Sequence, residues 1–467
     1  MDDSHNSSEI ARLAAGAGSR ETMLPVGAQR SAPLDALTRH NVLAESFFSA
    51  FNGIYMALAI MAAPVVAVSG LNASPLELTI LASAFPVGVF IGPLWADLGR
   101  RWGMQKLVTQ MAIWANVPLF LVYWVRDPLT FTALMTVSQF LNSAMRMGQS
   151  SLYRVMYPKE IRGRVLGKLT FWTFLTMVPS ILVTGWLLDK SREIYQVLYP
   201  LAGLCGLIGS YYYRMLHVPQ AERFPRDRAT IRARMAGVER IIASDRAYLL
   251  FQVAFFLSGS AFFMSNHVIL LLCKKSPDFH FNAFELALWM SVMPQLLLAV
   301  TSPIWGRVLD RIGIVRCRLL ISFFMTAYLT CHFGGIYAGI PWLIYLASML
   351  QGMSNGGGQL TWALASSHFA PRPEDVPLYT GIHFVLNGVR GLVMPWVGSI
   401  LFVLVQPWAV LAAAVVSLGS IPIIWRSLHV KEVSLETTTS IPEALGREPT
   451  TIVREAGAVE HPPPVPG

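Results

Sequence analysis

The feature that most constrains this chain is a series of twelve apolar runs, each long enough to cross a lipid bilayer. A membrane-spanning helix needs about 20 mostly apolar residues. The runs lie at about 42–69, 76–97, 106–124, 129–151, 167–188, 196–214, 247–272, 283–306, 317–338, 341–365, 378–403 and 407–427. Of the 467 residues 54% are hydrophobic and 13% are charged, whereas soluble proteins carry about 25% charge. Because a backbone in lipid must satisfy its own hydrogen bonds, we expect an all-α, polytopic membrane protein.

The basic residues predict the orientation of the chain. If the N-terminus lies in the cytoplasm, the outer loops contain only Arg126, Lys190, Arg192, Lys274 and Lys275. Most of the 36 Lys and Arg residues then face the cytoplasm, as the positive-inside rule requires. We therefore expect an integral protein of the plasma (inner) membrane with both termini cytoplasmic. The same distribution accounts for the net charge of +9 without a nucleic-acid partner.

The composition divides the chain into five parts. Residues 1–41 and 429–467 are polar and are expected to be disordered cytoplasmic tails. Residues 42–214 and 247–428 each hold six spans, joined by the linker 215–246. In that linker apolar side chains recur at helical spacing, at Ile231, Met235, Val238 and Ile242. They predict an amphipathic helix, which either lies on the inner leaflet or is a solvated connector.

The two six-span parts are related by an internal repeat. With a shift of 210 residues, Gly92-Pro-Leu-Trp-Ala-Asp-Leu-Gly-Arg-Arg-Trp-Gly103 aligns with Ser302-Pro-Ile-Trp-Gly-Arg-Val-Leu-Asp-Arg-Ile-Gly313. Pro, Trp, Arg and Gly coincide, and Gly148-Gln149 aligns with Gly358-Gln359. Duplicated halves with a site between them near the bilayer midplane are a common plan of transporters.

The segment Gly306-Arg-Val-Leu-Asp-Arg-Ile-Gly313 resembles the loop signature G-x-x-x-D-R-x-G of the major facilitator superfamily (MFS). Residues 157–167 resemble the connection between the fourth and fifth helices of that superfamily. The resemblance covers about 42–428 and implies the MFS fold, with 12 transmembrane helices in two pseudo-symmetric six-helix bundles. It implies that the first, fourth, seventh and tenth helices line a central cavity, and that the second, fifth, eighth and eleventh join the halves. An Arg usual in the fourth helix is replaced by Gln139.

The resemblance also implies a cytoplasmic gate, formed by Arg101, Gly103, Asp310, Arg311 and Gly313. In it Asp310 would latch against the start of the fifth span, near Gly167 and Lys168. The first half departs from the pattern, because Arg100 stands where the acid belongs; Asp97 could replace it. These loops can also be interpreted simply as positive charge on tight turns.

Polar residues recur every three or four positions inside several spans, so each set lies on one helix face. Because polar groups facing lipid are costly, we expect these faces to point inward. The candidate substrate-binding residues are Asn52, Asn142, Arg146, Gln149, Asn266, His267, Asn355, Gln359, Asn387 and Arg390.

Most of these residues also allow a purely structural interpretation. Asn142 could simply bond a neighbouring helix. Glu45 and Arg146 are expected to form an ion pair, and His267 to be a hydrogen-bonded helix residue. Glu45 and His383 are the candidates for proton coupling, although a lone histidine near the inner boundary, such as His383, is more often structural.

Two further features stand out inside the spans. Gly356, Gly357 and Gly358 weaken the tenth span, and they provide either a hinge or close packing. Arg390 lies mid-span with no acid one turn away, so it needs a partner elsewhere, either a carboxylate or an anionic solute. The flanking Gly388 and Gly391 allow a close approach.

Together these features predict a secondary transporter that works by alternating access, acts as a monomer and carries a small anionic or zwitterionic solute, with possible proton coupling left open. The alternative is a non-transporting membrane sensor or assembly partner. The sequence contains no recognisable nucleophile–base set, metal cluster or phosphate loop, so we expect neither an enzyme nor a cofactor. The four cysteines are scattered and predict no disulfide framework.

Overall fold

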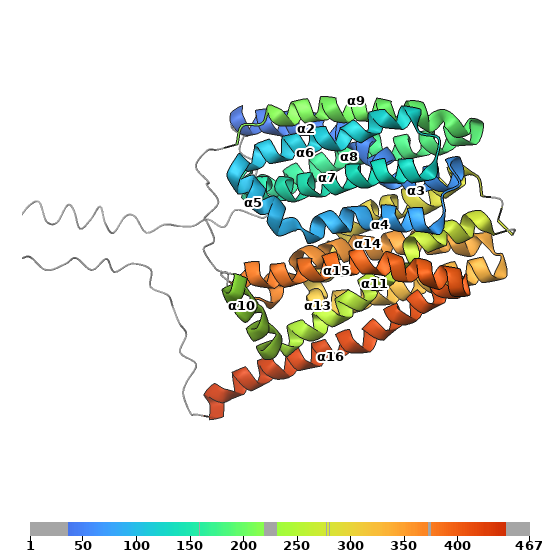
Figure 1. Ribbon diagram of the computed structural model, residues 1–467. Coiled ribbons are helices and arrows are strands. Elements are labelled where there is room, and N and C mark those ends of the chain that lie inside the picture. Colours follow the sequence, from blue (N-terminus) through green and yellow to red (C-terminus); the bar gives the residue numbers. More distant parts are fainter. Residues whose placement is uncertain are drawn as a thin grey trace, which may run out of the picture.

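The computed structural model describes residues 36–157, 159–218, 231–276, 278–279, 281–371 and 375–444, and within these ranges the chain is helical without strands. Figure 1 shows two groups of helices, with the first half of the chain above the second. Both ends of the described chain lie on one side of the molecule, here called the termini end, together with the linker helix (Figure 1). The opposite side is called the loop end.

The first half begins with one long helical segment that crosses the molecule. It consists of α2 (Ala36–Met56), η1 (Ala57–Ala62), α3 (Ala63–Val65) and η2 (Val66–Gly70), of which η1 and η2 are π-helical. The remaining elements are α4 (Pro75–Phe90), α5 (Gly92–Trp102), α6 (Met104–Leu121), η3 (Val122–Trp124), α7 (Pro128–Met156), α8 (Lys159–Lys190), η4 (Arg192–Ile194) and α9 (Tyr195–Arg214). Between α4 and α5 the chain bends by 55°.

The second half repeats this order after the linker helix α10 (Ile231–Ser244). Its elements are α11 (Arg246–Lys275), α12 (Ala283–Leu286), η5 (Ala287–Val292), α13 (Met293–Ala338), α14 (Pro341–Phe369), α15 (Val376–Val405) and α16 (Trp408–Ala444). The predicted eighth span begins in α12 and η5 and continues into the long α13, which also contains the ninth span. The two spans lie on either side of Gly313, whose φ of 78° is not helical.

The repeat is visible in the backbone as well as in the sequence. Gly103 has φ 89° and Gly313 has φ 78°, and the two stand 210 positions apart. L-residues are disfavoured at such angles because their Cβ clashes with the backbone, whereas glycine adopts them freely. The same backbone conformation therefore explains why both motifs end in glycine.

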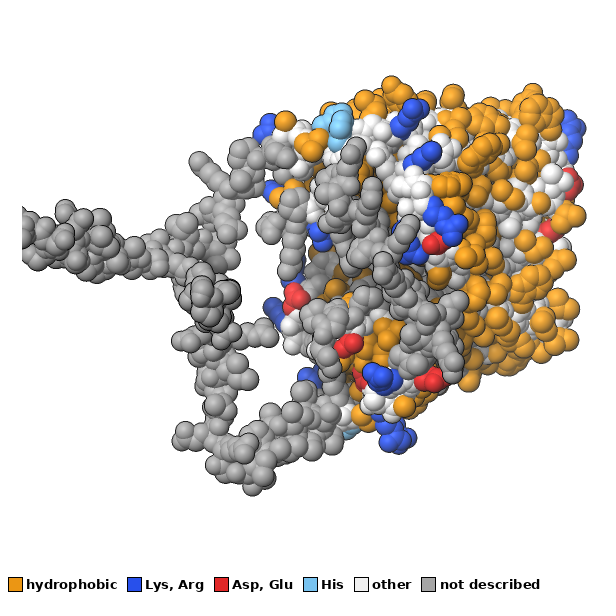
Figure 2. Space-filling view, turned by 60° about the vertical axis from the view of Figure 1, so that its left-hand side comes forward, with side chains coloured by type: hydrophobic (Ala, Val, Ile, Leu, Met, Phe, Trp, Pro, Cys, Tyr) orange, Lys and Arg blue, Asp and Glu red, His pale blue; other side chains and the backbone are white. Residues whose placement is uncertain are grey.

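Eight described helices are long and apolar enough to cross a membrane, or nine if the bent pair α4–α5 counts as one span. The 29-residue helices α7 and α14 are not among them, although they are long enough. They contain several of the polar residues that the sequence singled out. The all-α membrane class is confirmed, and Figure 2 shows hydrophobic side chains over the sides of the molecule and Lys and Arg gathered toward the termini end.

One helix end and one helix face differ from the sequence-based expectation. The helix α16 continues to Ala444, well past the expected end at 427, so part of the predicted C-terminal tail is helical. The linker does contain a helix, α10, but Ile241 is buried in it whereas the predicted face residue Ile242 is exposed. The predicted tail residues 1–35 and 445–467 lie outside the described ranges.

Four spans make the main contacts between the halves. α4 packs along α15, and α8 packs against α12 and η5. These elements correspond to the second, eleventh, fifth and eighth spans, the set that the resemblance implied. The space enclosed between them holds the candidate site.

Candidate functional site

A cavity of about 330 Å³ lies between the two halves. Its wall includes residues of η1, α3, α4 and α7 from the first half and of α11, η5, α13, α14 and α15 from the second. This volume is at the small end of the range for ligand sites in proteins. Four predicted site residues line it, Asn266, His267, Asn355 and Asn387.

The polar part of the cavity wall consists mainly of amides. Gln351 Nε2 donates to Asn266 Oδ1 at 3.4 Å, and Gln139 Nε2 donates to the carbonyl of Ala59 at 2.8 Å. Gln295, Asn355 and Asn387 also reach the cavity. An amide offers both a donor and an acceptor, so this wall can bond hydroxyl, carbonyl and ring-nitrogen groups of a ligand.

Apart from His267 and Ser291, the rest of the wall is apolar. Aromatic rings of Phe85, Phe262 and Phe263 and the side chains of Met61 and Met290 face the space. None of the described residues that line it is Asp, Glu, Lys or Arg. The cavity therefore suits a molecule with hydrogen-bonding groups and an apolar face.

On the loop-end side of the cavity the halves are tied together by hydrogen bonds. Ser291 Oγ donates to the carbonyl of Met61 at 3.1 Å. Thr79 of α4 is hydrogen-bonded to Ser399 of α15, and His267 Nε2 lies 2.8 Å from the same Ser399 Oγ. A cavity residue is thereby connected to a contact between the halves.

A stronger tie lies at the loop end itself. Asp189, next to the end of α8, accepts hydrogen bonds from the backbone nitrogens of Ala283 at 2.7 Å and Phe284 at 3.0 Å. It thus caps the start of α12 in the other half, where the free N–H groups and the helix dipole favour a carboxylate. A Cβ on Gly185 would meet the backbone of Phe284 at 2.9 Å, so the two helices touch closely here.

Halfway along the molecule α15 meets α4 through its glycines. A Cβ on Gly388 would come within 2.9 Å of the Cα of Phe90, and one on Gly391 would collide with Pro86. The sequence predicts a close approach at these two glycines, and α4 is the helix that packs against them. The contact leaves no room for a side chain at either position.

At the termini end, α8, α13 and α15 have no close neighbour at several glycines. A Cβ added at Gly163 or Gly167 in α8, at Gly306 in α13, or at Gly381 in α15 would have no atom within 4 Å. Asp310 is exposed, and no hydrogen bond or ion pair joins it to the described residues at the start of α8. The expected latch between Asp310 and the region of Gly167 and Lys168 is therefore not formed in this conformation.

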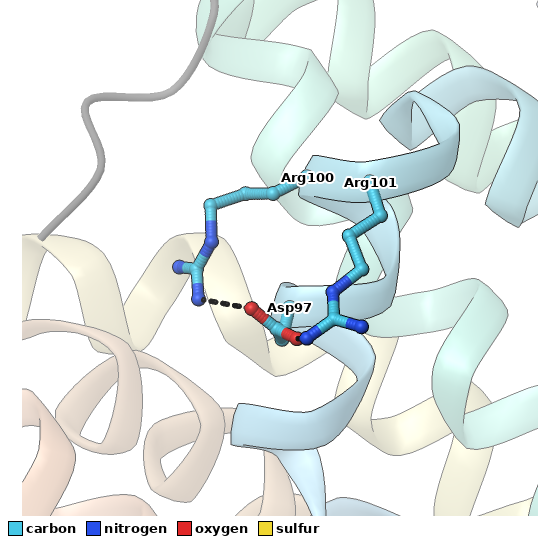
Figure 3. A network of polar contacts seen from close by, with 3 residues as sticks. All are labelled: Asp97, Arg100 and Arg101. Atoms are coloured by element: carbon cyan, nitrogen blue, oxygen red, sulfur yellow. Dashed lines mark hydrogen bonds and ion pairs between the residues drawn. The ribbon is translucent and has the colours of Figure 1, made fainter.

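The first-half loop forms a local network instead of a latch. Asp97 pairs with Arg100 at 3.1 Å and with Arg101 at 2.9 Å, all on α5 (Figure 3). Exposed ion pairs of this kind contribute little stability. The suggestion that Asp97 replaces the missing acid in a contact with the other half is not realised here, because both of its oxygens face arginines of its own helix.

Two predicted residues of the first half face inward but not toward the cavity. Asn52 and Asn142 lie in a narrow space between α2, α6, α7 and α9, together with Asn116. Both amide atoms of Asn142 are buried without a partner among the described residues. Helical periodicity indicates an inward face, but it cannot tell the core of one half from the space between the halves.

Glu45 and Arg146 do not form the expected ion pair. The Glu45 carboxylate accepts hydrogen bonds from Tyr157 Oη at 2.6 Å and from Gln149 Nε2 at 3.4 Å. The guanidinium of Arg146 contacts Met56 Sδ. The carboxyl and the cation therefore have separate surroundings, and the described partners of Glu45 are neutral.

Arg390 is buried in the second half and does not line the cavity. It donates to the carbonyl of Phe255 at 2.7 Å and to Asn387 Oδ1 at 2.6 Å, and Asn387 does reach the cavity. His383 lies 3.0 Å from Gln252 Oε1 through Nδ1. Sequence reasoning misses a second buried cation, Arg318, because it stands next to a basic loop and resembles positive-inside charge.

The three consecutive glycines of α14 lie in a continuous helix. A Cβ at Gly356 or Gly357 would crowd Trp305 of α13, at 3.3 Å and 2.8 Å. Gly358 has free space around it, and Gln359 is exposed. Close packing explains the first two glycines, and a hinge at this point stays a prediction.

Comparison with known proteins places this geometry in a wider context. The family model described as "Major Facilitator Superfamily" matches residues 253–463. No curated protein matches the chain. The matched segment covers the second half, which the internal repeat relates to the first.

Several solved structures share the fold. A point mutant of the nucleoside transporter NupG superposes with a TM-score of 0.67 at 13% identity, covering 84% of this chain and 99% of that one. A POT family transporter in complex with a thioalcohol-conjugated peptide gives 0.63 at 9% identity, covering 84% and 96%. A bacterial homolog of the human lysosomal transporter Spinster, in an inward-facing and unoccupied conformation, gives 0.57 at 11% identity, covering 85% and 98%. At these identities the likeness establishes the fold.

Proposed function

We propose that the chain is a secondary transporter of the Major Facilitator Superfamily, whose family model matches residues 253–463, and that it carries a small uncharged solute. The solute binds in the cavity between the halves, and its hydrogen-bonding groups contact the amides of Asn266, Gln351, Asn355 and Asn387. His267 contributes an imidazole to the same wall.

The observation that carries the proposal is the lack of formal charge on the described wall of the cavity. The sequence favours an anionic or zwitterionic solute only if Arg146 and Arg390 line the cavity. Neither does so. An ionic solute would lose its hydration energy in this cavity, and neutral amides alone would not compensate for that loss. A neutral molecule that combines polar edges with an apolar face therefore fits better.

The unequal closure of the two ends supports alternating access as the transport mechanism. Asp189, Ser291 and the Thr79–Ser399 pair join the halves on the loop-end side. The termini ends of α8 and α13 have open space at their glycines. By the positive-inside rule the termini end faces the cytoplasm, so we infer a conformation that exchanges solute with the cytoplasm.

The direct test is transport by the purified protein in liposomes, using a panel of neutral, anionic and zwitterionic metabolites. A neutral compound should be taken up, and Asn355→Ala should reduce its uptake at least tenfold because an amide contact is lost. The control Gln196→Ala removes an amide that binds the Val125 carbonyl and does not line the cavity, and it should transport normally. Uptake of charged compounds only, or equal uptake by both variants, would contradict the assignment.

The alternative, a sensor that does not transport, makes a different prediction in the same vesicles. A sensor would bind a solute, detected as a rise in thermal stability, without moving it across the bilayer. The closed and open ends described above favour the transporter, since a sensor has no need of access from both sides.

A further inference from the structure

Two arginines from different helices converge on one aromatic ring in the second half. The guanidinium carbon of Arg318 lies 4.0 Å from the ring centroid of Phe255, and that of Arg390 lies 4.8 Å from the same centroid. The two cations are therefore no more than about 9 Å apart, close enough to repel each other across a protein interior. Their residues are 3% and 6% exposed.

The hydrogen-bond partners of both guanidinium groups are neutral. Arg390 uses the Phe255 carbonyl and the Asn387 amide oxygen, and Arg318 uses the hydroxyl of Ser258. No ion pair to either cation is found among the described residues. Two buried positive charges at one ring thus lack a counter-charge, which is costly in a protein within a membrane.

Three buried donors in this cluster are also left without an acceptor among the described residues. They are Nε of Arg318, Nε of Arg390 and Nε2 of Gln252, which come from α13, α15 and α11 in turn. Gln252 belongs to the cluster because its other amide atom faces His383, whose ring lies 4.8 Å from that of Phe255. The cluster therefore has both unpaired hydrogen-bond donors and two cations without a negative partner among the described residues.

We propose that a small inorganic anion of chloride size binds at this Arg318–Arg390–Gln252 cluster. It accepts hydrogen bonds from the unused N–H groups and neutralises the two cations. Phe255 lies against both cations, and the Arg390 guanidinium already occupies the space beside Gly259, so the surroundings favour a small anion over an organic one. The site is separate from the solute cavity, with Asn387 contacting both.

Anion-dependent thermal stability of the purified full chain tests the proposal. Chloride is titrated against gluconate at constant ionic strength, and unfolding is followed by tryptophan fluorescence. Saturable binding to the folded state should raise the midpoint by roughly 2–5 °C. Arg318→Gln should abolish the rise, whereas Arg100→Gln, which changes an exposed cation of α5, should retain it.

Equilibrium binding of radioactive chloride to the wild-type protein keeps the test decisive even if Arg318→Gln does not fold. About one chloride per chain, displaced by bromide but not by gluconate, supports the site. The proposal is overturned by an absence of saturable chloride binding, by stabilisation with phosphate alone, or by an unchanged chloride response in a folded Arg318→Gln variant.

Discussion

Neighbouring polar residues on one helix have different surroundings in this protein. Asn387 reaches the cavity, while Arg390, one turn further along, points into the second half and holds the Asn387 amide. Both lie on the face that the sequence indicates. A helix face about 100° wide touches more than one neighbour, so spacing alone cannot separate a cavity residue from one that positions it.

Glu45 offers the clearest test of proton coupling. Its carboxyl is fully buried and its described hydrogen-bond donors, Tyr157 and Gln149, are neutral. A carboxyl in such surroundings can gain and lose a proton without breaking an ion pair. If it couples protons to transport, Glu45→Gln should still exchange solute down its gradient but should lose uptake driven by a pH gradient.

The measurement is solute uptake into liposomes with and without an imposed pH gradient. Glu193→Gln, which changes an exposed carboxyl at the loop end, is the matched control and should behave as wild type. Proton-driven uptake that persists in Glu45→Gln would exclude this carboxyl as the carrier and leave His383 as the remaining candidate.

At the scale of single elements, the motif glycines test a backbone argument without changing any contact. A Cβ added at Gly103, Gly163 or Gly313 would lie in free space, but only Gly103 and Gly313 have positive φ. Gly313→Ala, at φ 78° and ψ 169°, should lower the free energy of unfolding by about 1–3 kcal/mol. Gly163→Ala, in the regular helix α8, should instead be neutral or slightly stabilising.

Thermal unfolding of the three alanine variants in one detergent makes the comparison. Equal stability of Gly313→Ala and Gly163→Ala would show that the backbone conformation is not the reason for glycine in the motif. Gly103→Ala should lower the stability as Gly313→Ala does, because both positions have positive φ and correspond in the repeat.

How much of each element is predictable depends on the kind of signal. Bilayer-length apolar runs predict the membrane helices, and the repeat predicts which elements correspond. Helix ends are poorly marked: α2 begins at Ala36 and α16 ends at Ala444, because a polar sequence can continue a helix once the apolar part has nucleated it. Arg318 is hidden for a related reason, since charge near a basic loop carries no sign of its burial.

On the scale of the whole molecule, the sequence predicts the two halves but not the end at which they close. That choice depends on contacts between distant residues, such as Asp189 with the start of α12. Helix-capping potential is common in sequences, and nothing in the local pattern around Asp189 indicates that its partner lies in the other half.

Asp189→Ala should therefore shift the balance between the two ends. Losing two charge-assisted hydrogen bonds weakens the loop-end contact by about 1–3 kcal/mol, enough to change the ratio of conformations roughly fivefold or more. Distances between spin labels at Arg126 in the first half and Tyr337 in the second should lengthen on average. Glu193→Ala is the control, and an unchanged distance distribution in Asp189→Ala would exclude the cap as a closing contact.

The glycine contacts halfway along α4 and α15 have a consequence for how the halves can move. Phe90 and Pro86 rest directly on the bare backbone at Gly388 and Gly391, at a depth between the closed end and the open one. A contact at that depth can act as a pivot between the halves. One end of the cavity then narrows as the other widens, while the α4–α15 contact itself stays closed. Solute would then pass beside the α4–α15 contact. Any side chain larger than hydrogen at Gly388 or Gly391 would push the two helices apart.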